Sequence, residues 1–158
     1  MDFAACYRAE MPALVRHVMY HGAAEQEAYD AAQSAFEHAY QVWETIRNPR
    51  AWLRTVAVRA YYRSAVRPET PTDSLPEQTS EVSATVGAED LEQERAVLAG
   101  LAALPVKQRQ VMAWHFDGFA PAEIAQALDI DPAAVRQNLL KARRNLKQLL
   151  GIAGREGR

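Results

Sequence analysis

The stretch APAEIAQALDIDPAAVRQNLLKARRNLKQLL, residues 120–150, contains two short helical patterns separated only by residues 128–131 (LDID). So short a connection leaves room for nothing but a sharp turn. Asp131 can accept hydrogen bonds from the free N–H groups of the second helix, and Pro132 fits its first position, where a missing N–H costs nothing. The second helix carries one apolar stripe at helical spacing, formed by Val135, Leu139, Ala142, Leu146 and Leu149.

The opposite side of this second helix is cationic and carries an amide. At about 100° per residue, it bears Arg136, Gln137, Leu140, Lys141, Arg144 and Lys147. A helix with such a face, presented behind a tight turn, has the geometry that lays side chains into a DNA major groove. The stretch therefore predicts a helix-turn-helix. The alternative is a pair of packed helices with a solvated basic face, because such motifs are loosely defined.

The composition indicates a cytoplasmic protein without membrane insertion. The 158 residues allow one domain or two small ones, and an apolar content of 49% is enough for packed cores. No apolar run approaches the roughly 20 residues that cross a bilayer, and the N-terminus does not resemble a secretory signal. The single cysteine, Cys6, excludes an intrachain disulfide framework and a thiolate-rich zinc site.

The distribution of charge is more informative than the net charge of −2. Residues 47–67 contain six arginines and no acid, whereas residues 69–94 contain eight acids and no base. Residues 132–158 contain seven basic residues against one acid. Solvated helix faces usually mix signs, so two basic blocks around an acidic one favour a polyanionic partner.

The chain is predicted to be all-α, with two small helical domains joined by a flexible acidic linker. The linker, residues 67–89, has three prolines, many polar residues and too little apolar surface to offset the entropy of ordering. Residues 1–66 show three helical segments and no strand alternation, and residues 90–151 show four helical segments. Residues 152–158 form a tail. The two domains need not touch, because a flexible linker of this length spans roughly 25 Å.

Packing faces are predicted for the helices of the first domain. The second helix has aromatic and small residues spaced for packing, namely Tyr29, Ala32, Phe36, Tyr40 and Trp43. The third helix begins at Asn48-Pro49, a cap followed by a first-turn proline, and its core stripe is Trp52, Leu53, Val56, Ala57 and Ala60. The arginines of this helix are expected on its outward face, with Arg50 and Arg54 on one flank and Arg59 and Arg63 on the other.

Four motifs in order complete the sequence pattern. Residues 30–36 (DAAQSAF) are similar to a D-x-x-Q-x-x-F motif, and residues 48–53 (NPRAWL) to a "PRAWL"-like segment. Residues 101–111 (LAALPVKQRQV) are similar to an "ALPxxxRxV" opening, which is followed by the helix-turn-helix. Together they resemble the extracytoplasmic-function group of the sigma-70 family, the short bacterial sigma factors that retain only regions 2 and 4. The chain departs from that pattern at Ala120, where a hydroxyl cap is usual, at Val58-Arg59, and at Arg63.

The resemblance implies a transcription initiation factor that has no catalytic activity of its own and needs no cofactor or metal. Its implied partners are RNA polymerase core, through the β′ coiled coil and the β subunit, and promoter DNA; an anti-sigma factor is a further candidate. Region 4 would bind the −35 element, and region 2 would help melt the −10 element. The resemblance also assigns the second helix to the β′ coiled coil. Asp30, Gln33 and Glu37 lie on it at three- and four-residue spacing, so all three can share one side, and carboxylates with an amide suit an arginine-rich surface.

Two sets of residues are predicted to contact DNA. The −10 candidates combine cations for phosphates with aromatic rings for stacking: Arg47, Asn48, Arg50, Arg54, Arg59, Tyr61, Tyr62 and Arg63. The −35 candidates combine base readers near the start of the recognition helix with phosphate anchors further along: Ala133, Arg136, Gln137, Leu140, Lys141, Arg143, Arg144 and Lys147.

Three other functions are weighed against this one. A helix-turn-helix regulator that works without polymerase would need neither the basic third helix nor the D-x-x-Q-x-x-F motif. A sigma-like module that titrates an anti-sigma factor would not need base-reading side chains. His17 and His21 have metal-ligand spacing, but two histidines without a third ligand make a weak site. No phosphate-binding loop, catalytic triad or carboxylate pair indicates an enzyme.

Overall fold

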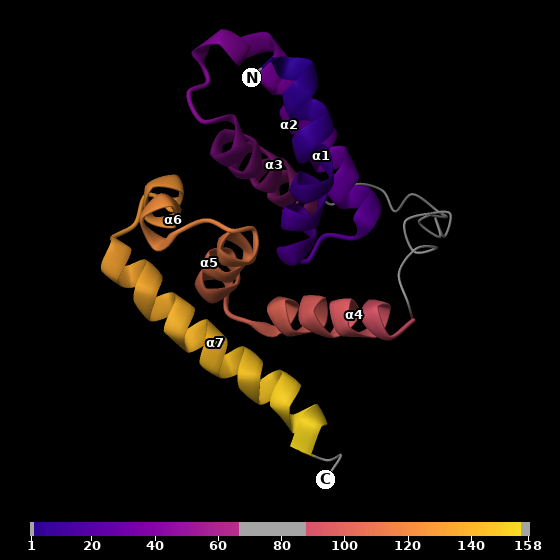
Figure 1. Ribbon diagram of the computed structural model, residues 1–158, viewed down its shortest axis with the longest axis vertical. Coiled ribbons are helices and arrows are strands. Elements are labelled where there is room, and N and C mark those ends of the chain that lie inside the picture. The colour runs from indigo at the N-terminus through magenta and orange to yellow at the C-terminus, as the bar shows by residue number, and fades with distance from the viewer. Residues whose placement is uncertain (1, 67–87, 156–158) are drawn as a thin grey trace.

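The computed structural model describes residues 2–66 and 88–155, and this part of the chain is all-α, as predicted (Figure 1). Residues 67–87 and 156–158, most of the predicted linker and the end of the tail, lie outside the described residues. The helices in chain order are α1 (Phe3–Tyr20), α2 (Glu25–Val42), the 3-10 helix η1 (Trp43–Thr45), α3 (Pro49–Val66), α4 (Ala88–Ala103), α5 (Val106–Phe116), α6 (Pro121–Leu128) and α7 (Pro132–Arg155).

Helices α1, α2 and α3 form one bundle, in which each helix packs against the other two. Side-chain oxygens at the helix starts accept hydrogen bonds from free backbone N–H groups: Asp2 Oδ1 accepts from Ala5 N–H at 2.7 Å, and Glu27 Oε1 accepts from Ala24 N–H at 2.8 Å. The core combines large and small residues: Leu14, Val18, Ala28, Ala32, Ala35, Phe36, Ala39, Leu53 and Ala57. The third helix begins at Pro49, as the Asn48-Pro49 signal predicts.

The packing face predicted for α2 is partly wrong. Ala32 and Phe36 are buried, but Tyr29 is 44% exposed and Tyr40 is 70% exposed. The face of α2 that carries its alanines packs against the neighbouring helices. These small side chains let the three helices approach closely. The two tyrosines consequently lie at the margin of that face.

Helices α4 to α7 surround a second core, which Trp114, Phe119, Ile124, Val135 and Leu139 help to fill. The predicted apolar stripe of α7 is buried as far as Leu146, but Leu149 is 44% exposed. The prediction for Leu149 is therefore wrong. Leu146 and Leu150, rather than Leu149, lie close to Gly100 of α4: a Cβ added at Gly100 would be 3.0 Å from Leu146 Cδ2 and 4.0 Å from Leu150 Cδ2. The end of α7 therefore presents Leu146 and Leu150 to α4.

The two helical groups lie in contact with each other. Helix α1 packs on α4 and α5, and α3 packs on α6. Tyr20 of α1 and Ala51 of α3 lie against the second core. In Figure 1, α5 lies next to the α1–α3 bundle, and α7 runs along the outer side of the second group. Within the described residues, no helix is both long and apolar enough to span a membrane.

Candidate nucleic-acid interface

Residues 121–155 form the helix-turn-helix that the sequence predicts. Helix α6 ends in Asp129, whose φ of 54° lies in the left-handed region and allows the chain to reverse toward α7. Asp131 Oδ1 accepts from Ala133 N–H at 3.3 Å, and Pro132 is the first residue of α7, so both predicted start signals are confirmed. Glu123 Oε1 accepts from Ala120 N–H at 2.9 Å, so α6 retains a side-chain cap although Ala120 has no hydroxyl group.

The predicted −35 candidates share one solvent-exposed face of α7. All eight are exposed: Ala133, Arg136, Gln137, Leu140, Lys141, Arg143, Arg144 and Lys147. The opposite face packs on α5 and α6. Leu140, which is 56% exposed, is a large apolar residue on this open face. This face can therefore meet a partner without any rearrangement of the domain.

Four of the −10 candidates are exposed: Arg47, Asn48, Arg59 and Arg63. Asn48 also accepts a hydrogen bond at its Oδ1 from Ala51 N–H at 3.4 Å and so caps α3.

Tyr61 and Tyr62, the aromatic −10 candidates, are half-buried, with ring centroids 5.4 Å apart. The Tyr62 hydroxyl lies 3.3 Å from His21 Nδ1. Both rings keep some exposed surface that a base could reach.

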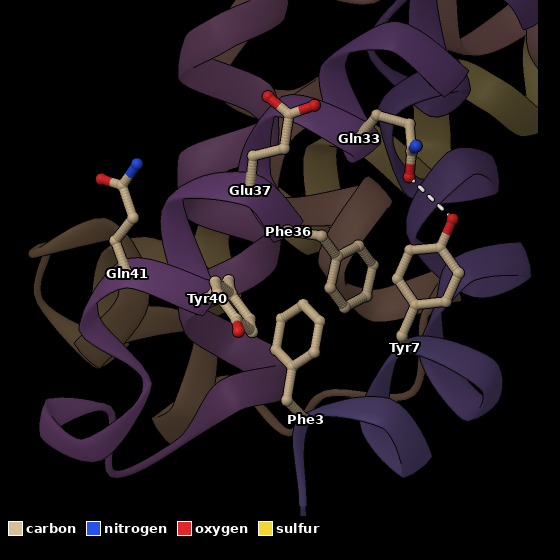
Figure 2. A pocket seen from close by; sticks show the side chains of 7 residues that line it. All are labelled: Phe3, Tyr7, Gln33, Phe36, Glu37, Tyr40 and Gln41. Carbon is tan, nitrogen blue, oxygen red and sulfur yellow. Dashed lines mark hydrogen bonds between the residues drawn. The ribbon is translucent and has the colours of Figure 1, made fainter.

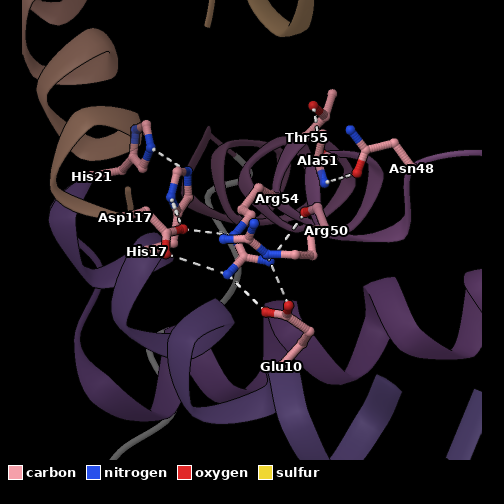
Figure 3. Close-up of polar contacts among 9 residues, drawn as sticks. All are labelled: Glu10, His17, His21, Asn48, Arg50, Ala51, Arg54, Thr55 and Asp117. Atoms are coloured by element: carbon pink, nitrogen blue, oxygen red, sulfur yellow. Dashed lines mark hydrogen bonds and ion pairs between the residues drawn. The ribbon is translucent and has the colours of Figure 1, made fainter. Parts of the chain in front are cut away.

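Arg54 does not lie on the outward flank of α3, so that prediction is wrong. Its side chain is fully buried, because an acidic residue from the other helical group meets it. Arg54 Nε donates to Asp117 Oδ2 at 2.6 Å, and Nη2 donates to Asp117 Oδ1 at 3.3 Å and to Glu10 Oε2 at 3.0 Å (Figure 3). Burial alone would lower the pKa of Arg54, but these two carboxylates hold it above its ordinary value.

Arg50 lies beside this buried ion pair and remains exposed on one side. Arg50 Nε is 3.0 Å from Glu10 Oε1, so Glu10 bridges the two arginines of α3. The Arg50 guanidinium also lies 4.8 Å from the centre of the Phe119 ring, which follows α5 in the second group. Both arginines that were expected to face outward together therefore contact the α5–α6 connection.

His17 and His21 are buried and contact each other, at 3.4 Å between their Nε2 atoms. His17 Nδ1 lies 2.9 Å from Asp117 Oδ2. If His17 donates there, its Nε2 accepts from His21, whose Nδ1 then accepts from Tyr62, so two neutral rings satisfy the whole chain of contacts. Burial lowers the pKa of His17, and burial with the nearby charges of His17 and Arg109 lowers the pKa of His21 to about 3.

The metal-ligand interpretation of the two histidines has no support in this geometry. Their ring nitrogens face each other and neighbouring protein groups. Among the residues that the structure describes, no three His, Cys, Asp or Glu side chains gather as a cation site.

The predicted polymerase-binding residues lie along one side of α2. Asp30 and Glu37 are exposed, and Gln33 Oε1 accepts a hydrogen bond from the Tyr7 hydroxyl at 2.8 Å. Gln33 and Glu37 border an open groove of about 480 Å³, whose floor includes Phe3 and Phe36 (Figure 2). The groove gives this side of α2 an apolar surface next to its carboxylates and amide.

Comparison with known families accounts for both helical groups. The model for sigma-70 region 2 matches residues 6–68, and the model for sigma-70 region 4 matches residues 94–146. These matches together span most of the chain. The chain belongs to the sigma-70 family. Because regions 2 and 4 are the two that match, this sigma factor is a member of the extracytoplasmic-function group.

Solved structures show the same fold as this sigma factor. CnrH in complex with the cytosolic domain of CnrY matches with a TM-score of 0.71 and 22% identity, over 95% of this chain and 88% of that one. The sigma factor RpoE from Bartonella quintana, in complex with the anti-sigma factor NepR, matches with a TM-score of 0.70 and 19% identity, over 96% and 98% of the two chains. A search of curated protein sequences found no significant match.

Sequence reasoning missed the residues that join the two regions of this sigma factor. Asp117, Glu10 and Phe119 are not among the residues that the sequence patterns single out. No local pattern could identify them, since Arg54 and Asp117 are 63 residues apart in the chain. Arg109 has a role that is visible only in the structure: its guanidinium donates to the Leu101, Ala102 and Leu104 carbonyls at the end of α4.

Proposed function

We propose that this sigma factor directs RNA polymerase core to specific promoters. Region 4 binds the −35 element through α7, and region 2 helps to melt the −10 element. The exposed cationic face of α7 is the observation that carries this proposal. The apolar face of α7 is packed in the core, and its cationic face is open to solvent. Catalysis stays with the polymerase, and the sigma factor needs no cofactor.

The face of α7 is arranged to read bases at one end and to hold phosphates further along. Arg136, Gln137 and Lys141 lie in its first turns, the part of a recognition helix that comes nearest to base edges. Arginine pairs with guanine O6 and N7, and glutamine pairs with adenine N6 and N7. Leu140 can meet a thymine methyl group. Arg143, Arg144 and Lys147 bind phosphates. Such contacts fix the register of the protein on the duplex but do not read its sequence.

Helix α3 and the residues before it are proposed to engage the −10 element. A melted strand needs cations along its phosphates and flat rings for its bases. Arg47, Arg59 and Arg63 supply exposed cations, and Tyr61 and Tyr62 supply rings. A base stacked on such a ring contributes about 1–3 kcal/mol.

Helix α2 is proposed to bind the β′ coiled coil of the polymerase through Asp30, Gln33 and Glu37, while the β subunit meets the sigma factor elsewhere. An anti-sigma factor is a further proposed partner, since CnrH and RpoE were each solved in a complex, the latter with an anti-sigma factor. A polymerase partner places the protein in the cytoplasm. A polymerase-independent regulator and a sigma-like decoy remain the alternatives, and the experiment below separates the decoy from the other two.

Arg136→Ala is expected to weaken binding to the cognate −35 duplex by about 1–3 kcal/mol and to relax preference at one base pair. The matched variant Lys147→Ala should weaken all duplexes about equally and lower the salt dependence by roughly one phosphate contact. Both side chains are exposed on α7, so neither change should disturb the fold. Titrations of labelled cognate and random duplexes at several salt concentrations measure both effects.

Equal losses for the two variants on cognate and random DNA would contradict the division into a base reader and a phosphate anchor. A wild-type chain that shows no preference for any duplex, with or without polymerase, would favour the decoy.

A further inference from the structure

The guanidinium of Arg143, on the exposed face of α7, lies against a histidine of another helix. His115 is in the last turn of α5, and its Nε2 atom is 3.4 Å from Arg143 Nη2. The His115 side chain is half-buried, whereas Arg143 is exposed. Among the residues that the structure describes, no carboxylate forms an ion pair with Arg143. Its positive charge is therefore not neutralised within the described part of the chain.

This contact requires a neutral His115 ring. A guanidinium only donates hydrogen bonds, so the Nε2 atom that faces it acts as an acceptor. Burial, together with the nearby charge of Arg143, lowers the pKa of His115, which favours the neutral ring. Of the charged groups that the structure describes, Arg143 is the one that shifts this pKa. Asp117, two residues further along, has its carboxylate turned to Arg54 and His17.

The pair of side chains lies along one margin of the α7 face. At about 100° per residue, Arg136, Arg143 and Lys147 fall within about 40° of one another around the helix axis. A cationic row at the margin of a recognition helix can follow the phosphates that border the groove. His115 meets this row from the side of α5, so a phosphate held by Arg143 lies next to the His115 ring.

We propose that His115 is a DNA-binding residue and that it forms, with Arg143, a two-cation site for one backbone phosphate of the −35 duplex. The phosphate oxygens accept hydrogen bonds from the Arg143 guanidinium and from the Nε2–H of a protonated His115. These bonds replace the contact between the two side chains, and both are charge-assisted. The site rests on the proposed function, because it assumes that α7 binds duplex DNA.

Binding at this site takes up one proton from the solution. In the free chain, the charge of Arg143 opposes the protonation of His115. A phosphate placed between them offsets that charge and adds an opposite one, which raises the pKa of His115. The DNA-bound form therefore binds more protons than the free form, and the affinity for DNA rises as the pH falls from the bound-state pKa to the free-state pKa.

The test is the affinity of the full chain for a labelled mixed-sequence duplex, measured at constant low salt at about pH 8 and about pH 6. A phosphate contact does not depend on base sequence, so the promoter need not be known. The wild-type chain should bind about 5-fold more tightly at the lower pH, within the tenfold per pH unit that the uptake of one proton allows.

Two substitutions at His115 separate its charge from its contact with Arg143. His115→Gln cannot be protonated but keeps an acceptor, so it should match the wild-type affinity at the higher pH and lose the gain at the lower pH. His115→Arg carries the second cation throughout, so it should bind at the higher pH about as tightly as the wild type does at the lower one. The matched control His38→Gln makes the same change at an exposed histidine of α2 and should keep the wild-type pH dependence. Circular dichroism verifies that each variant keeps its helices.

A second measurement uses the wild-type chain alone. The pKa of His115, followed by nuclear magnetic resonance of its ring, should lie below the ordinary value of about 6.5 without DNA and above it in the duplex complex. The spectrum of His115→Gln identifies the resonance, because only that signal is missing.

Equal pH dependence in the wild type and in His115→Gln would overturn the site, and so would a His115 pKa that the duplex leaves unchanged. Duplex binding that persists in either case would leave the proposed function standing. A folded wild-type chain that binds no duplex at either pH would contradict the proposed role of α7 and, with it, this site.

Discussion

Asp30→Lys combined with Glu37→Lys is expected to abolish the binding of this sigma factor to RNA polymerase core. Both side chains are exposed on one side of α2, so the change reverses two charges without removing any core contact. The proposed partner surface is rich in arginine, and like charges placed together at an interface cost several kcal/mol. Binding to fluorescently labelled core polymerase measures the effect. The hydrogen bond between the Tyr7 hydroxyl and Gln33 Oε1, on the same side of α2, is left intact.

The matched control for this variant is Glu25→Lys combined with Glu44→Lys. These residues are also exposed in region 2, and the total change in charge is the same. The control should keep core affinity within a few-fold of wild type. If the two double variants bound core polymerase equally well, this side of α2 would not be the polymerase interface.

Phe36→Ala is expected to destabilise region 2 by about 3–5 kcal/mol. Phe36 is 2% exposed, and its ring lies edge-on to those of Phe3 and Tyr7, at 6.1 and 4.8 Å between centroids. Its loss leaves a cavity in a bundle of about 60 residues, which has little stability in reserve. The melting temperature should fall by more than about 10 °C. Thermal unfolding followed by circular dichroism checks this.

Tyr40→Ala is the control on the same helix. Its side chain is 70% exposed, and its ring has an edge contact with the Phe3 ring at 5.2 Å between centroids. We expect a loss of about 1 kcal/mol or less. Equal destabilisation by the two variants would contradict the observed orientation of α2.

Much of the fold follows from local sequence patterns. The start signals at Pro49 and Pro132 mark helix starts that the structure confirms, because a proline at the first helical position depends only on neighbouring residues. The stripe of α7 is buried from Val135 to Leu146, since a strongly amphipathic helix orients itself by its apolar side. The solvent-exposed face of α7 then follows from the same period.

Patterns fail where distant elements decide the environment. Tyr40 has the spacing of a packing residue, but the buried alanines of α2 set how the helix turns. Arg54 has the spacing of an exposed cation, but it is buried by Asp117, which comes from another region of the chain. Local periodicity carries no information about such long-range ion pairs. The sequence therefore predicts a set of −10 residues, but it does not predict that one of them, Arg54, is buried.

The most direct test of the account is to reconstitute the chain with core RNA polymerase and to map the 5′ ends of the transcripts made from genomic DNA. A sigma factor should produce defined start sites that are absent with core alone and that share sequence elements near −35 and −10. The contradictory result is a transcript pattern identical to that of core alone, made with a folded chain that still binds specific duplexes by itself. That outcome would identify a helix-turn-helix regulator that acts without polymerase.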